Sequence, residues 1–146
     1  MTQQEKYNQR TAASIASLRM DFGARVQQWL DKCCSEGLNP LIHMGARTVP
    51  QQQHLRDLYE AGKGPRAAEP RKSYHCYGRA VDWVNIVATN GRESDLDWDN
   101  VATYKKGIQI AQSFGLHSIG AIDLDHLQDE NYDTWRDLPK SELIDD

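Results

Sequence analysis

The chain has 146 residues, a length that suits one domain built around a single hydrophobic core. It is 39% hydrophobic and 26% charged, as is ordinary for a globular protein, and its net charge of −4 gives no support to nucleic-acid binding. No stretch approaches the ~20 apolar residues of a membrane span. We therefore expect a monomeric single domain over residues 1–146, with a helical region at 1–38, a core at 39–128 and a tail at 129–146.

The first predicted element is an amphipathic helix from about Gln4 to Cys34, with Gly23 as the candidate position for a break. Its apolar residues recur at steps of three and four, with polar residues between them. They are Ile15, Leu18, Phe22, Val26, Trp29, Leu30 and Cys33. This pattern predicts that the helix covers one side of the core.

A short buried strand is predicted at residues 41–44, followed by a helix that begins at Thr48. Thr48 and Gln51 have the spacing of a capping box, and Pro50 lies in the first turn. The helix is expected to end at Gly62. Arg47 stands between the strand and the helix, where side chains often project into a cleft.

Residues 64–72 are predicted to form a loop that leads into the stretch from Ser73 to Asp82. The β-branched and aromatic residues at 79–87 predict a strand that is apolar on both faces and hence central in its sheet. A carboxylate in such a strand is costly to bury unless it is paired. Asp82 therefore needs a metal ion, an arginine or a set of backbone donors.

The remaining predicted elements are a helix over residues 101–114 and a strand over residues 116–122. They lead to Asp123 and His126. Residues 129–146 are acidic and polar, and we expect residues 142–146 to be loosely held. The three cysteines are an odd number without a disulfide spacing, so we interpret them as reduced thiols, and nothing around Cys76 indicates an activated nucleophile.

Two histidines and a carboxylate, His75, Asp82 and His126, are the candidate metal ligands. This is a chemically reasonable ligand set for a hydrolytic zinc site, in which the metal activates water and polarises a carbonyl. Asp123, three residues before His126, is a candidate general base, and Arg47 is a candidate for stabilising a developing oxyanion.

The motifs that carry these residues resemble those of the zinc peptidases of the D-alanyl-D-alanine carboxypeptidase and dipeptidase group. That group includes phage endolysins that cut the L-alanyl-D-glutamate bond of peptidoglycan. The matching motifs are Ser73-x-His75-x-x-Gly78-x-Ala80-x-Asp82, Asp123-x-x-His126, Gly45-x-Arg47-Thr48 and Gln52. The resemblance extends over residues 41–128.

The resemblance implies zinc bound by His75, Asp82 and His126, with Asp123 as general base. It also implies that Arg47 binds the substrate carbonyl and that Ser73 holds the substrate or a ligand, and His117 is a further candidate substrate contact. Two departures concern the substrate pocket. The stretch before the last motif lacks the glycine-rich pattern of many members, and Asp125 and Leu127 replace the usual flanking proline and phenylalanine. Asp125 competes for the role of base, but its neighbouring position in a strand predicts that it faces away.

We therefore expect an α+β fold with a small central antiparallel sheet, flanking helices and a zinc cleft over the sheet. The expected activity is hydrolysis of the L-alanyl-D-glutamate bond of the peptidoglycan stem peptide, as in phage endolysins. The alternatives are a D-Ala-D-Ala carboxypeptidase or dipeptidase and, in another class, a non-catalytic zinc-stabilised cell-wall-binding domain. Because the N-terminus lacks the features of a secretory signal, we expect synthesis in the host cytoplasm and action on the wall after holin-type release.

Overall fold

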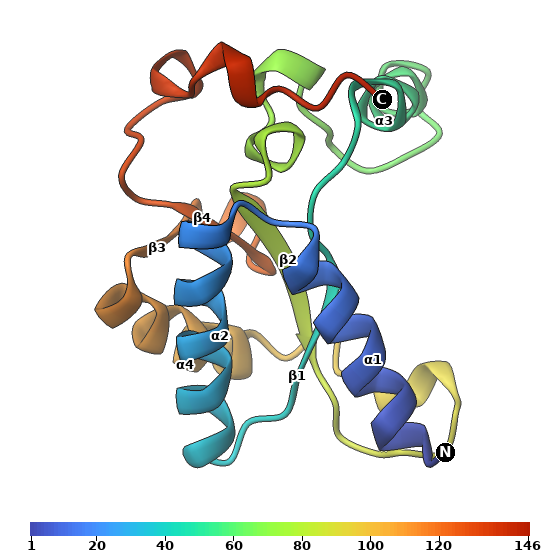
Figure 1. Cartoon of the computed structure of the whole chain (residues 1–146). Helices are drawn as coiled ribbons and strands as arrows, with labels where there is room; N and C mark the ends of the chain where they lie inside the picture. The colour runs from blue at the N-terminus through green and yellow to red at the C-terminus, as the bar shows by residue number, and fades with distance from the viewer.

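The computed structural model describes residues 1–146 and has the predicted α+β architecture, with a four-stranded antiparallel sheet (Figure 1). The strands are β1 (Pro40–Met44), β2 (Ala80–Asn85), β3 (Leu116–Ser118) and β4 (His126–Asp129), in the order β1-β2-β4-β3. The α-helices are α1 (Gln3–Ala16), α2 (Met20–Ser35), α3 (Val49–Glu60) and α4 (Val101–Ala111). None of them combines the length and the apolar character that a membrane crossing requires.

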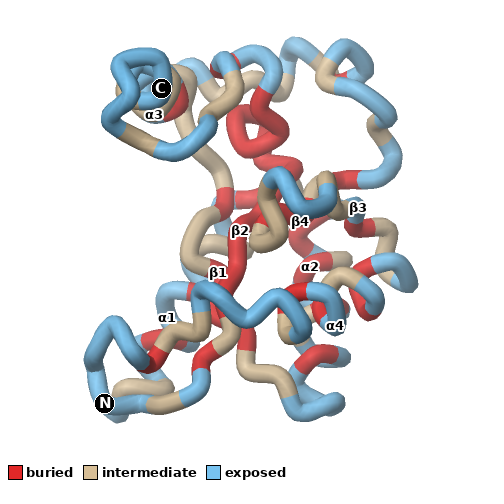
Figure 2. The backbone as a smooth tube through the Cα atoms, turned by 180° about the vertical axis from the view of Figure 1, so that it is seen from behind, coloured by how far each residue is buried: buried red, intermediate tan, exposed pale blue.

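The main hydrophobic core lies between the sheet and the helices α2 and α4. Trp83 of β2 packs edge-on against Trp29 of α2 and against Tyr104 of α4, at ring-centroid distances of 5.2 Å in both cases. Gly107 allows this approach, since a Cβ there would collide with the Trp83 ring. Buried residues accordingly run through β2 and β4 (Figure 2). Because strand side chains alternate between faces, Asp82 points to the face opposite this core.

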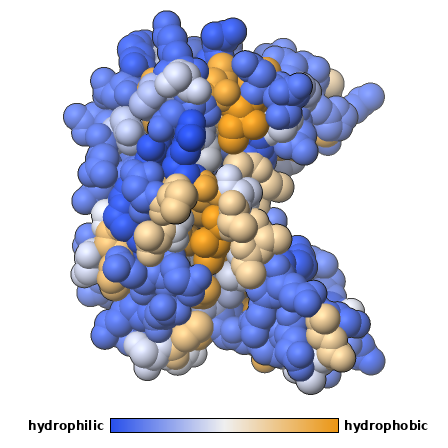
Figure 3. Space-filling view, viewed as in Figure 1, coloured by the Kyte–Doolittle hydropathy of each residue, from blue (hydrophilic) through white to orange (hydrophobic).

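Helix α1 lies along the outer edge of β1 and supplies hydrogen bonds that the strand would otherwise lack. The backbone N–H of Ile42 donates to Thr11 Oγ1 at 3.1 Å, and the Ser14 hydroxyl donates to the Ile42 carbonyl at 2.8 Å. Such cover protects an edge strand from pairing with other chains. Seen as in Figure 1, the surface of the molecule is mostly hydrophilic, with apolar side chains gathered near the middle (Figure 3). Its outline is indented between α3 and α1.

The long N-terminal helix predicted from the periodicity is two helices, and the break is at residues 17–19 rather than near Gly23. Gly23 lies inside α2, where a Cβ would come within 3.4 Å of the Ile15 carbonyl oxygen of α1. The glycine therefore permits close packing of the two helices and does not interrupt either of them. Periodicity continues across the break because Ile15 at the end of α1 and Leu18 in the break pack on the same core as the apolar face of α2.

Helix α3 begins as predicted, since Thr48 and Gln51 form the capping box. The predicted loop that follows it includes a short 3₁₀ turn, η1 (Pro70–Lys72), and a second such turn, η2 (Tyr74–Tyr77), carries His75.

The C-terminal segment is anchored, in contrast to the loose end expected from its composition. The Ile144 backbone N–H donates to the Cys76 carbonyl at 2.8 Å, and its carbonyl accepts from the Val49 N–H at 2.8 Å. Glu142 receives two hydrogen bonds from the buried Arg79 guanidinium, at 2.8 and 3.0 Å. The tail is thereby tied to the start of α3 and to the turn that carries His75.

Candidate functional site

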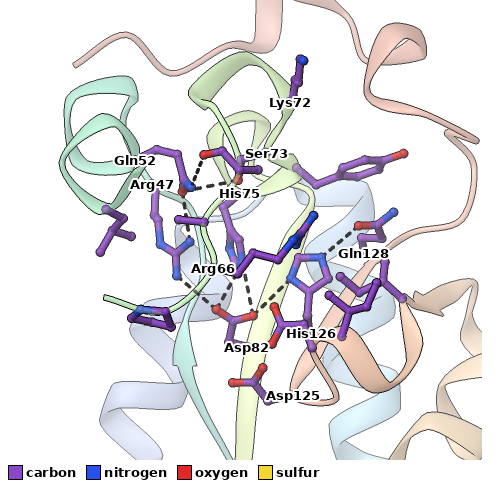
Figure 4. A pocket seen from close by; sticks show the side chains of 18 of the residues that line it. Arg47, Gln52, Arg66, Lys72, Ser73, His75, Asp82, Asp125, His126 and Gln128 are labelled. Atoms are coloured by element: carbon purple, nitrogen blue, oxygen red, sulfur yellow. Dashed lines mark hydrogen bonds and ion pairs between the residues drawn. The ribbon is translucent and has the colours of Figure 1, made fainter. Parts of the chain in front are cut away.

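A cavity of about 520 Å³ lies over the polar face of the sheet, between the α3 side of the molecule and the connection between β3 and β4. His75, Asp82 and His126 lie together in it (Figure 4). One ligand atom from each of the three lies within 4.8 Å of the others, and all three residues are buried. The structure thus brings together the three ligands that the sequence predicted.

Two local features place these side chains. Asp82 of β2 lies directly opposite His126 of β4 in the antiparallel register, so their side chains leave the same face as neighbours. His75 comes from η2, which ends at Gly78 with φ of +68°. Glycine adopts this left-handed conformation without strain, and the turn brings His75 back over Asp82.

Hydrogen bonds fix which nitrogen of each imidazole faces Asp82. His75 Nδ1 donates to the Gly45 carbonyl at 2.8 Å, so Nε2 faces the Asp82 carboxylate at 3.3 Å. His126 Nε2 donates to Gln128 Oε1 at 2.9 Å, so Nδ1 faces the same carboxylate at 3.2 Å. Two imidazole lone pairs and a carboxylate therefore converge with no donor among them. A cation or protons must lie between them, and outer hydrogen bonds of this kind are typical of metal-ligating histidines.

The pKa values of the three groups reflect both their burial and their closeness to one another. Burial opposes ionisation of Asp82, but when protons lie between the three groups, the attraction and hydrogen bonds of the two histidines hold the pKa of this carboxyl well below its usual range. Burial lowers the pKa of His75. For His126 burial is again the largest effect and lowers the pKa, but the hydrogen bond to Asp82, the charge of Asp82 and the hydrogen bond to Gln128 together outweigh it and raise the pKa. The site therefore keeps Asp82 as an anion and His75 as a neutral imidazole, the forms that ligate metals.

Arg47 and Ser73 line the same cavity. The Arg47 guanidinium donates to Asp82 Oδ2 at 3.1 Å and to Gln52 Oε1 at 3.1 Å, and its backbone N–H donates to the His75 carbonyl at 3.0 Å. The Ser73 hydroxyl donates to the same Gln52 oxygen at 3.4 Å. Two bonds of the Arg47 side chain leave further N–H groups of its five as donors.

Asp123 and Asp125 both line the cavity, and their carboxyl groups come within 4.8 Å of Asp82. The expectation that Asp125 faces away is wrong, because β4 begins only at His126 and strand alternation does not apply before it. Burial, followed by the hydrogen bond that the protonated Asp123 carboxyl donates to Asp125, raises the pKa of Asp123. Asp125 Oδ2 in turn lies 3.5 Å from His43 Nε2. Asp123 as the base stays a prediction, and its support is its place in the cavity.

Two other candidates lie away from the chemistry. His117 is exposed on β3 and is not among the residues that line the cavity, so the structure gives no support to it as a substrate contact. Cys76 is buried next to His75 in η2, and burial raises the pKa of its thiol to about 11. A protonated thiol of this kind is a filler of the core and not a nucleophile.

Residues that the sequence reasoning did not assign also belong to the site. Gln128 orients His126, His43 contacts Asp125, and Arg66 lines the cavity. Gln128 stands two positions after His126 in β4, so strand alternation places both on the same face. That spacing was the available signal for Gln128, whereas His43 and Arg66 come from segments that are distant in sequence.

The fold is that of known peptidases. The chain is similar to the structure of an L-Ala D-Glu endopeptidase, ChiX of Serratia marcescens, with a TM-score of 0.62 and 18% identity over 89% of this chain and 90% of that one. It is also similar to the vancomycin-resistance D,D-pentapeptidase VanY from a VanB-type cassette. The Zn(II) complex of the VanY E175A mutant gives a TM-score of 0.57 at 19% identity, over 77% of this chain and 72% of that one.

A third structure, VanYB in complex with D-alanine-D-alanine, gives a TM-score of 0.56 at 20% identity, over 76% of this chain and 70% of that one. No protein-family model and no curated protein sequence matches the chain. At these identities the similarity establishes the fold. The motif resemblance implied this same fold. The three structures are of an L-Ala D-Glu endopeptidase and of D,D-peptidases, which are activities of the group that the motifs resemble.

Proposed function

We propose that this protein is a zinc-dependent peptidase of the peptidoglycan stem peptide and that it cleaves the L-alanyl-D-glutamate bond. The observation that carries the proposal is the donor set, in which two oriented imidazoles and the Asp82 carboxylate converge at an open cavity. Asp123 and Arg47 line the same cavity. The likeness to ChiX and VanY supports the same class of substrate.

The residues fit a zinc ion. His75 Nε2, His126 Nδ1 and one Asp82 oxygen would hold it, the typical number of protein ligands for a catalytic site that keeps a position open. When bound, zinc lowers the pKa of water and polarises a carbonyl. Gly45 and Gln128 orient the two imidazoles, so the ligands are arranged before the metal arrives.

Other residues of the cavity have proposed roles in proton transfer and in stabilising the transition state. Asp123 is placed to take a proton from the attacking water and to return one to the leaving amine. The free N–H groups of Arg47 are placed to donate to the carbonyl oxygen as negative charge develops on it. Ser73 and Gln52 hold the Arg47 side of the cavity through the shared Gln52 oxygen.

The non-catalytic alternative is disfavoured by the surroundings of the ligands. A structural zinc site is closed by a fourth protein ligand, whereas this one opens into a cavity that also contains Asp123 and Arg47. The D-Ala-D-Ala carboxypeptidase or dipeptidase is the second candidate, and the likeness to VanY with bound D-alanine-D-alanine favours it. The two enzymes differ in the bond that they cut and hence in the new amine that they release.

Digestion of purified peptidoglycan distinguishes these activities. We expect the zinc-loaded protein to release peptides whose new amino terminus is D-Glu, identified by mass spectrometry after labelling of free amines. Release of D-Ala would instead show that the protein is a D-Ala-D-Ala carboxypeptidase or dipeptidase. Intact peptidoglycan after prolonged incubation would overturn the proposed function and leave the wall-binding alternative.

We further propose a phage-endolysin role, in which the protein is made in the host cytoplasm and reaches the wall after holin-type release. The motif resemblance supports this setting. In cells that express the protein in the cytoplasm, the optical density should fall only after the inner membrane is permeabilised. Lysis without permeabilisation would contradict dependence on a holin.

The ligand assignment makes its own prediction. Wild-type protein should retain about one zinc per chain after dialysis, and His75→Ala should retain little, because removal of one of three ligands weakens a metal site severely. Metal content is measured by mass spectrometry, and circular dichroism checks that the metal-free variant is folded. His117→Ala is the matched control, since this exposed histidine lies outside the cavity. Stoichiometric zinc in His75→Ala would disprove the ligand set.

A further inference from the structure

Arg66 extends over the candidate metal site from the connection between α3 and η1, residues 61–69. It lines the same cavity as the three ligands, and Figure 4 shows its side chain in the space beside His75 and His126. It makes no hydrogen bond and no salt bridge with another residue of the protein. A guanidinium with five free donors therefore lies at the cavity.

The backbone on the C-terminal side of Arg66 is held by two side chains of α3. Arg56 Nη1 donates to the Ala67 carbonyl at 3.0 Å, and Gln52 Nε2 donates to the Ala68 carbonyl at 2.9 Å. On the other side, Gly64 packs closely on Leu58, where a Cβ would come within 3.1 Å of the Leu58 Cβ. The arginine is thus presented from a fixed base, which reduces the entropy lost when it binds a ligand.

The other cations that line the cavity already have anionic partners. Arg47 pairs with Asp82 at 3.1 Å, and Lys72 pairs with Glu69 at 3.2 Å and lies 5.4 Å from the centroid of the Trp135 ring. Arg66 is therefore the lining cation that is free to take an anion from outside. Guanidinium groups bind carboxylates through two parallel hydrogen bonds.

A different wall of the cavity is apolar. Ile119 and Ile122 come from the connection between β3 and β4, and Ile122 is 67% exposed. Leu55 and Leu58 of α3 also line the cavity. A cavity with apolar lining and one free guanidinium suits a small apolar residue next to an anionic one. An alanyl residue joined to a residue with a free carboxylate has this character.

We propose that Arg66 is a specificity-determining residue that binds the free carboxylate on the carbon bearing the scissile nitrogen. This inference rests on the proposed function and names the part of the substrate that the cavity selects. In the L-alanyl-D-glutamate bond this group is the α-carboxylate of D-Glu, because the chain continues through its γ-carboxyl. In D-Ala-D-Ala it is the terminal carboxylate, so the role of Arg66 holds for either bond.

The test compares L-Ala-γ-D-Glu-L-Lys with the same peptide in which the D-Glu α-carboxylate is an amide. We expect zinc-loaded wild type to prefer the acid by about tenfold or more in kcat/KM, the effect of one hydrogen bond to a charged group. Arg66→Gln should lose this preference by a rise in KM for the acid, with kcat unchanged within about twofold, because ground-state binding is what is lost. Its kinetics on the amide should match those of wild type.

Arg71→Gln is the matched control, since Arg71 is an exposed arginine five positions away that does not line the cavity. It should behave as wild type on both peptides, and Arg66→Lys should recover part of the preference. A second readout is the calorimetric affinity of metal-free protein for the product D-Glu-L-Lys and for the same product with an amidated α-carboxylate. Wild type should bind the acid more tightly than the amide, whereas Arg66→Gln should bind both equally.

Equal cleavage of acid and amide by wild type, or an unchanged preference in Arg66→Gln, would overturn the role of Arg66 while the proposed function stands. The parallel pair of D-Ala-D-Ala and its C-terminal amide gives the same comparison for the second bond. If zinc-loaded wild type cleaves none of the four peptides, the proposed function fails and this inference fails with it.

Discussion

Replacement of Asp123 with asparagine is expected to lower kcat by about 10²- to 10⁴-fold, the range that a positioned general base contributes. Zinc content should stay near that of wild type, since Asp123 is outside the ligand set of His75, Asp82 and His126. Asparagine keeps the size of the side chain but cannot accept a proton. The measurements are the rate of release of new amines from peptidoglycan and the metal content of the same samples.

Asp125 provides the internal comparison for this experiment, because it lines the cavity and hydrogen-bonds to Asp123. If Asp125 orients Asp123, Asp125→Asn should cost less than Asp123→Asn and should leave a measurable rate. A variant Asp123→Asn with near-normal kcat, together with an inactive Asp125→Asn, would reverse the two roles. Loss of zinc from Asp123→Asn would instead show that this carboxylate helps to hold the metal.

Arg79→Met is expected to destabilise the protein by about 3 kcal/mol, the lower end of the cost of breaking a buried ion pair by removal of one partner. Arg79 is 4% exposed and its guanidinium lies 2.8 Å from the fully buried Asp129. It also binds Glu142 of the tail and lies 4.9 Å from the Tyr132 ring centroid. The lower end applies because Arg25 stays 2.8 Å from Asp129. Urea unfolding of metal-free protein measures the change without the contribution of bound zinc.

Lys32→Met is the control for the loss of a salt bridge as such. Its pair with Glu36 is exposed and spans one helical turn, so its removal should change the free energy of unfolding by less than ~0.5 kcal/mol. Combining Arg79→Met with Asp129→Asn should recover part of the loss, because the buried charge is removed while the partly exposed Arg25 can reach water. Equal effects of Arg79→Met and Lys32→Met would show that the buried network is energetically unimportant.

The Arg79 network also has a consequence for the site. It holds Glu142, and two residues later Ile144 hydrogen-bonds to the Cys76 carbonyl, next to the candidate ligand His75. The tail, which lies outside the motif resemblance, thus contributes to the placement of a candidate metal ligand. The pocket wall formed by α3 is tied to the same tail residue through Val49.

The sequence alone predicted those features that depend on neighbours in the chain. The capping box at Thr48 is local, because a few residues contain all the groups that make it. The candidate ligands were also found in this way, since His75 and Asp82 are seven residues apart and a buried carboxylate in a central strand requires compensation. The α+β class was expected from the helical and strand patterns taken together with the motif resemblance.

The tertiary structure decided the features that depend on pairing between distant segments. The start of β4 at His126 places Asp125 in the cavity, and this start is set by pairing with β2 and not by the residues of β4 alone. The break between α1 and α2 is hidden in the sequence because Ile15 and Leu18, on either side of Ser17, pack into the same core as α2 and continue its apolar spacing. The anchored tail, the contact of His43 with Asp125 and the place of Arg66 at the cavity have the same cause. Each depends on contacts between segments far apart in the chain, whereas periodicity and composition report the preferences of single segments.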